Sequence, residues 1–152
     1  MTPEEKIKEL GFELPAPVAP LASYVPAQRV GNVLHISGQL PMDSEGLRKG
    51  TLGKDVGVEE AQKAAQICAL NILGQIKSSA GVELGDIKQF IKLGIFVAST
   101  PDFVEHHLVG NGASDLIGEI FGDVGKHARA AVGVSALPLG AMVEIEAIVE
   151  VQ

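Results

Sequence analysis

The last quarter of the chain, residues 127–151, alternates apolar positions with small or charged ones in two stretches. A turn signature separates the stretches, because Pro138 and Gly140 lie between them. The pattern predicts a β-hairpin in which Ala136 pairs with Ala141. One face of that hairpin is then apolar throughout, and other parts of the fold must cover it.

The opposite face of the predicted hairpin mixes charged and very small side chains. In this register it carries Arg129, Ala131, Gly133, Ser135, Met142, Glu144, Glu146 and Ile148. Small residues in a strand let a ligand or another sheet approach closely, and charges that become covered need partners. We therefore expect this face to be open to water, to hold a site or to form an interface. Arg129 and Glu144 share the face without standing opposite each other, so we expect no direct contact between them within one chain.

The first 20 residues predict a short helix followed by an extended arm. Residues 2–10 suit a helix, since Thr2 can cap it, Pro3 fits its first turn and Glu5 completes a capping box. Residues 14–20 contain too many prolines for a central strand. The arm should therefore lie on the surface.

The middle of the chain predicts strands and helices in alternation. We expect strands at 21–30, 32–39 and 87–98, a loop with a short hairpin at 42–57, and helices at 58–80 and from 100–102 to about 121. The order is β-β-α-β-α-β-β behind the short helix. This order predicts a single α+β domain over residues 1–152, a mixed sheet with two helices packed on one face. The uncovered face, with Arg129, Glu144 and Glu146, favours self-association.

Composition limits the possible functions. The 152 residues are 46% hydrophobic, which is enough to build a real core, and the net charge is −7 without a cluster of Lys or Arg. We therefore expect no nucleic-acid partner. The N-terminus is too polar for a signal peptide and no apolar run reaches the length of a membrane span, so we expect a cytoplasmic protein without a membrane partner. Cys68 falls in the apolar stripe of the 58–80 helix and is expected in the core.

Several short motifs together resemble one family. They are a Ser-Tyr-Val segment at 23–25, the strand I-S-G-Q-L-P at 36–41, a Phe-Val strand end before a Pro-Asp helix start, and the closing A-R…L-P…V-E-I-E-A pattern. The chain resembles the Rid (YjgF) family of reactive intermediate deaminases, over residues 21–151. The resemblance implies a chorismate-mutase-like fold and a homotrimer with clefts between its subunits.

The resemblance also implies an activity and a set of site residues. Members hydrolyse enamine or imine intermediates such as 2-aminoacrylate to 2-keto acids and ammonia, without cofactor or metal. By motif match, Arg129 would bind the carboxylate of a small imino acid and Glu144 would orient water. Tyr24, Ser37 and Gly38 would line the cleft, and we expect Asn111 to face it.

One departure from the family pattern concerns the position two residues after the arginine. Many members have cysteine there, whereas this chain has Ala131, whose backbone N–H alone could help to bind substrate. The segment 106–116 also differs from the family pattern, so we interpret the chain as a member of a divergent subgroup.

The chemistry of the two main candidates suits an imino acid. A guanidinium can hold a carboxylate through two hydrogen bonds, which fixes the position of the adjacent C=N carbon. A carboxylate such as Glu144 can hold the attacking water and transfer a proton.

Alternatives stay open for individual residues and for the function. Arg129 could form a structural ion pair with Glu146 or with another chain, and Tyr24 could be a packed strand aromatic. His35 is expected to be half-buried, and the His106–His107 pair to be solvated and not to bind metal. The protein could be a non-catalytic trimer that binds small carboxylates. A ribonuclease or translation inhibitor is a third possibility, which the charge of −7 disfavours.

Overall fold

The computed structural model describes residues 1–16 and 23–152. The helices are α1 (Pro3–Glu9), α2 (Val58–Ser78) and α3 (His106–Phe121), with 3-10 turns η1 (Leu84–Asp86), η2 (Gly122–Gly125) and η3 (Pro138–Gly140). The strands are β1 (Ala27–Val30), β2 (Val33–Gln39), β3 (Met42–Asp43), β4 (Gly46–Leu47), β5 (Ile87–Ala98), β6 (Ala128–Val134) and β7 (Val143–Val151). The predicted α+β class is confirmed.

Five strands form one mixed sheet in the order β1-β2-β7-β5-β6, and β3 and β4 pair as a small separate hairpin. Strand β5 runs parallel to β6 and antiparallel to β7. The predicted pairing of the last two strands is therefore wrong, because β5 lies between them. Alternation along two strands shows which side chains share a face of each strand, but it does not identify the neighbouring strand.

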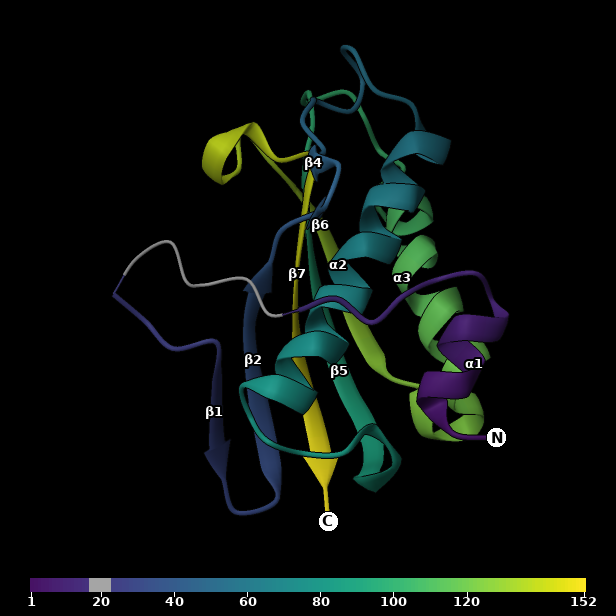
Figure 1. Cartoon of the computed structure of the whole chain (residues 1–152). Helices are drawn as coiled ribbons and strands as arrows, with labels where there is room; N and C mark the ends of the chain where they lie inside the picture. Colours follow the sequence, from purple (N-terminus) through teal and green to yellow (C-terminus); the bar gives the residue numbers. More distant parts are fainter. Residues whose placement is uncertain (17–22) are drawn as a thin grey trace.

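The helices α2 and α3 cover one face of the sheet, as expected (Figure 1). Their apolar sides pack on alternate residues of the two central strands, among them Leu93, Ile95 and Val97 of β5 and Val143 and Ile145 of β7, which are all buried. We call the other face of the sheet, which none of the described helices covers, the open face.

Arg129 lies on the helix side of the sheet, not on the open face. It pairs in register with Leu93, whereas Glu144 and Glu146 pair with Phe96 and Gly94 on the open face. The expectation that Arg129 and Glu144 share a face is wrong for the same reason as the hairpin. Because β5 lies between β6 and β7, the pairing of each strand with β5 determines which of its side chains point to the open face, and the turn between β6 and β7 does not.

Helix α2 is the long central helix of the helical layer. The apolar stripe that was predicted around Cys68 also contains Ala61, Ala65, Ile72 and Ile76, and all five residues are fully buried. Burial raises the pKa of the Cys68 thiol well above its usual value. Cys68 is therefore a core residue, as expected.

The N-terminal helix also follows its prediction. Thr2 and Glu5 form the capping box, with the Glu5 N–H donating to Thr2 Oγ1 over 3.1 Å and the Thr2 N–H donating to Glu5 Oε2 over 3.0 Å. Ile7 is buried, and Lys77 of α2 pairs with Glu4 over 2.6 Å. The capped helix is thus fixed against the end of the helical layer (Figure 1).

Two predicted boundaries differ from the structure. Helix α3 begins at His106 and not at residues 100–102, which form a turn. The first strand is shorter than expected and begins at Ala27. Most of the expected arm, together with the start of that strand, falls on residues 17–22, outside the described residues.

None of the helices within residues 1–16 and 23–152 combines the length and apolar character needed to cross a bilayer.

Candidate functional site

Arg129 is held at the edge of the sheet by three neutral groups. Its Nη1 donates to Asn111 Oδ1 and to Ser114 Oγ, each over 3.0 Å, and its Nη2 donates to the backbone oxygen of His107 over 3.1 Å. We call this set the Arg129 cluster. Among the described residues no carboxylate lies within ion-pair distance of the guanidinium. A cation oriented only by neutral partners can still bind an anion.

Glycines in α3 make room for this arrangement. A Cβ on Gly110 would lie 3.1 Å from Arg129 Nη1 and 2.8 Å from Cδ1 of Ile95, so a larger residue would push the guanidinium aside. A Cβ on Gly112 would collide with the backbone of Gln62 on α2, so this glycine lets the two helices approach closely. The two glycines are thus explained by packing, which helix propensity alone does not predict.

Glu144 and Glu146 lie on the open face, each above a glycine of a neighbouring strand. The Glu144 carboxylate occupies the space that a side chain on Gly38 would need, and the Glu146 side chain lies against Gly94 in the same way. Burial, and to a smaller extent the neighbouring charge of Glu146, raises the pKa of Glu144. A carboxyl group with a raised pKa is better suited to exchange a proton near neutral pH than an ordinary one.

Tyr24 and Ser37 lie with Glu146 around a hollow of about 400 Å³. The hollow is lined by Tyr24, Val25, Gln28, His35, Ile36, Ser37, Glu146, Ala147 and Ile148. Ser37 Oγ donates to the backbone oxygen of Val25 over 2.6 Å, and Tyr24 is 47% exposed, so Tyr24 is not a packed core aromatic. His35 is exposed and not half-buried as expected, because it points from β2 onto the open face.

The predicted site residues therefore form two groups within one chain. The first group lies on the helix side of the sheet. It comprises Arg129 and the half-buried Ala131, two residues further along the edge strand β6, together with Asn111 of α3. Tyr24, Ser37, Gly38 and Glu144 lie on the open face around β2 and β7. Strands in a sheet are about 4.8 Å apart, so β6 and β7 are separated by roughly 10 Å with β5 between them. One chain does not bring the two groups together.

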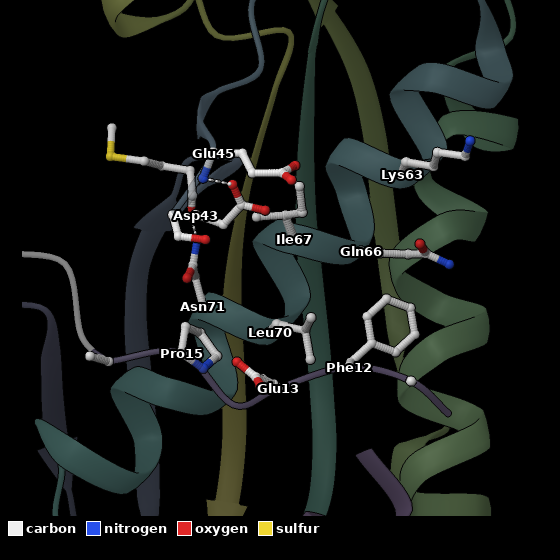
Figure 2. Close-up of a pocket in the computed structure, with 14 residues that line it drawn as sticks. Phe12, Glu13, Pro15, Asp43, Glu45, Lys63, Gln66, Ile67, Leu70 and Asn71 are labelled. Atoms are coloured by element: carbon white, nitrogen blue, oxygen red, sulfur yellow. Dashed lines mark hydrogen bonds between the residues drawn. The ribbon is translucent and has the colours of Figure 1, made fainter. Parts of the chain in front are cut away.

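A larger hollow of about 780 Å³ lies on the outer side of α2 (Figure 2). Its lining includes Phe12 after α1, Asp43 and Glu45 of the β3–β4 hairpin, and Lys63 and Leu70 of α2. Arg48 pairs with Asp43 over 2.9 Å and with Glu45 over 3.3 Å. None of the predicted site residues lines this hollow, so it is separate from both groups.

Sequence reasoning missed two contacts near Arg129. Ser114 was not expected at the site, and His106 was expected to be solvated. His106 is instead half-buried, with Nε2 3.1 Å from Ser99 Oγ. The sequence contained one indication of these contacts. His106, Gly110 and Ser114 are spaced four residues apart, which places them on one side of a helix.

Comparisons with known proteins agree with this architecture. The sequence profile of the family described as "YjgF/chorismate mutase-like, putative endoribonuclease" matches residues 4–151. The chain belongs to this family.

Its relatives include a protein named as an enzyme. Protein TCP17 of Trypanosoma cruzi is 48% identical over 146 residues, which cover 95% of this chain and 91% of TCP17. The mouse protein named 2-iminobutanoate/2-iminopropanoate deaminase is 34% identical over 134 residues, covering 88% of this chain and 83% of the mouse protein. The crystal structure of Atu1372 from Agrobacterium tumefaciens, titled as a protein with unknown function, is similar with a TM-score of 0.92 at 52% identity. The match covers 99% of this chain and 92% of that one. The YjgF family thus includes imine deaminases at about one-third identity to this chain.

Proposed function

We propose that this YjgF-family protein hydrolyses small 2-imino acids or their enamine tautomers to 2-keto acids and ammonia. The observation that carries the proposal is the guanidinium of Arg129, which Asn111, Ser114 and the His107 backbone orient without neutralising its charge. The chain has a net charge of −7, so an oriented cation without a carboxylate partner is a specific feature and not part of a general basic surface.

The reaction places few demands on the protein. An imine carbon next to a carboxylate is already electrophilic, and anchoring the carboxylate on Arg129 fixes the direction from which water can attack. The pKa of Glu144 is raised, so this carboxyl group can accept a proton from that water and return it to the leaving amine.

In this proposal Arg129 and Glu144 act from different copies of the chain. Within one chain they lie on opposite faces of the sheet, so a shared site requires that the β6 edge of one copy meets the open face of another. A cyclic homotrimer satisfies this requirement, because each of its equivalent contacts would join one Arg129 cluster to one Glu144. Tyr24, Ser37 and Gly38 would then line the cleft opposite Arg129, and Asn111 would orient the guanidinium.

The test is the decay of a 2-imino acid generated in situ by an amino acid oxidase. Wild type should accelerate the decay, and Arg129→Ala should lose at least about 100-fold in kcat/KM because the carboxylate is no longer positioned. Arg29→Ala, which removes an exposed guanidinium of β1 that binds backbone and Asn32 oxygens, is the matched control and should keep full activity.

Other outcomes separate the alternatives. Full activity of Arg129→Ala contradicts the assignment of this residue. Absence of turnover by wild type with several imino acids, combined with binding of a 2-keto acid that Arg129→Ala abolishes, supports a carboxylate-binding protein instead. Cleavage of RNA by wild type that Arg129→Ala abolishes would contradict the deaminase proposal in favour of a ribonuclease.

A further inference from the structure

His106 lies at the edge of the sheet in a fixed orientation. Its Nε2 is 3.1 Å from Ser99 Oγ, and its ring stands edge-on to Phe103, with ring centroids 5.1 Å apart and an interplanar angle of 88°. A side chain on Gly133 would collide with the imidazole, so the glycine on β6 leaves space for it. Three separate neighbours thus hold one histidine that the proposed mechanism has not used.

The imidazole and the Arg129 guanidinium lie on the same side of α3. Residues four apart lie above each other on a helix face, and His106 and Gly110 have this spacing. The guanidinium lies against Gly110, where a Cβ would be 3.1 Å from Nη1. His106 and the glycine that the guanidinium contacts are therefore about one helical turn apart along α3, or roughly 5 to 6 Å in rise. On the facing strand, Ala131 lies between Arg129 and Gly133 with its side chain on the same side.

A hollow of about 580 Å³ opens at His106, toward the end of the sheet. It is lined by Thr51, Lys54, Ser99, Thr100, Pro101, Phe103, His106, Gly133, Val134 and Ser135. No carboxylate is among these residues, and Lys54 is the other charged or titratable group that shares the hollow with His106. Arg129 is not among the lining residues, and a substrate that reached this hollow from Arg129 would meet no carboxylate there.

We infer that His106 is the acid–base residue on the Arg129 side of the site, acting on the imine group of a substrate whose carboxylate binds Arg129. This inference rests on the proposed function. The distance of one helical turn suits it, because the imine carbon of a 2-imino acid is bonded directly to the carboxylate carbon. Ser99 can accept a hydrogen bond from a protonated ring nitrogen or donate one to an unprotonated nitrogen, so it holds the imidazole in both states. Ala131, a small and half-buried residue, is the position of β6 between Arg129 and Gly133 on this side of the sheet.

The proton transfers balance with water as the only co-reactant. As the water oxygen bonds to the imine carbon, Glu144 of the other copy takes one water proton. His106 in its protonated form gives a proton to the nitrogen, which receives the electron pair of the C=N bond. His106 then removes the proton of the new hydroxyl group as the carbonyl forms. The proton held by Glu144 passes to the nitrogen as the C–N bond breaks, which releases ammonia and the 2-keto acid and restores both residues.

The test compares His106→Gln with His127→Gln in the same imine-decay assay. His127 is outside the Arg129 cluster, and its Nδ1 lies 3.0 Å from the backbone oxygen of Ala128, so it is a matched histidine control. We expect His106→Gln to lower kcat by about 100-fold or more with KM changed by less than about threefold, since the carboxylate anchor is intact. His127→Gln should behave as wild type. Added imidazole should restore part of the activity of His106→Ala.

A second measurement uses the wild-type protein and needs no variant to fold. A 2-keto acid product should protect His106, and not His107, from modification by diethyl pyrocarbonate. Equal modification of His106 with and without the keto acid, or an unchanged kcat in folded His106→Gln, would overturn the inference. If Arg129→Ala is inactive while His106→Gln is normal, only this inference fails. If wild type itself does not accelerate imine decay, the proposed function fails.

Discussion

At the scale of single residues, Glu144 lies in surroundings that disfavour its charge. It is half-buried above Gly38 and next to Glu146, and its pKa is raised by burial first and by Glu146 second. A carboxyl group whose pKa is higher in the folded than in the unfolded protein costs stability when it ionises. Functional groups are often kept in such unfavourable surroundings, and replacing them commonly stabilises the protein.

Glu144→Gln should therefore raise the melting temperature at neutral pH. The cost of the ionised carboxylate is present above the folded pKa and disappears as pH falls below the ordinary value of 4.5, where Glu144 is protonated in both states. The gain from the glutamine should accordingly shrink between neutral pH and pH 4. Thermal unfolding of wild type and variant at several pH values measures the difference in melting temperature. Glu150→Gln on the same strand is the control for loss of charge. A melting temperature lowered at pH 7, or a gain independent of pH, would contradict this account of Glu144.

The sequence offered candidate site residues, but it did not predict how these residues lie relative to one another. The motif around Arg129 and Glu144 could be recognised because it depends only on residue type and on spacing along the sequence. The faces of these two residues depend on β5, which ends 30 residues before β6 begins. Alternation is a property of one strand at a time, so it could not show that Arg129 turns toward α3.

At the scale of secondary-structure elements, the close contact of α2 with α3 depends on one glycine. A Cβ on Gly112 would overlap the backbone of Gln62, which cannot move as a flexible side chain can. In the same helix, a Cβ on Gly118 would meet nothing within 4 Å. The same substitution at the two positions therefore has opposite consequences.

Gly112→Ala should destabilise the fold by roughly 1 to 3 kcal/mol through overpacking. Gly118→Ala should leave stability unchanged or raise it by up to about 1 kcal/mol, because alanine is the better helix former. Chemical denaturation of both variants gives the two free energies of unfolding directly. Equal effects of the two substitutions would show that helix propensity, and not the contact between α2 and α3, governs this helix.

Elements with strong local signals were predicted closely, and those set by distant contacts were not. The capping box of α1 and the apolar stripe of α2 both matched their predictions. The start of α3 was placed too early because Pro101 and Asp102 resemble a helix start. Residues 100–102 instead form a turn, in which the Phe103 N–H donates to the Thr100 oxygen over 3.2 Å.

At the scale of the whole molecule, the sheet is covered on one face and open on the other. The open face mixes apolar side chains such as Val132, which is 46% exposed, with the carboxylates of Glu144 and Glu146. The order of the strands puts the Arg129 cluster at one edge of the sheet and Glu144 on its open face. This separation is the reason for proposing that two copies of the chain build each site.

Complementation between inactive variants tests this central claim most directly. Arg129→Ala and Glu144→Gln are each expected to be inactive alone. The two are unfolded together in equal amounts, refolded and assayed for imine hydrolysis, with each variant refolded alone as the control. If every site takes Arg129 from one copy and Glu144 from another, random mixing gives an intact pair at about one site in four, and about a quarter of wild-type activity returns. If the mixture stays as inactive as the separate variants although it assembles, Arg129 and Glu144 do not act across two copies, and the shared site is contradicted.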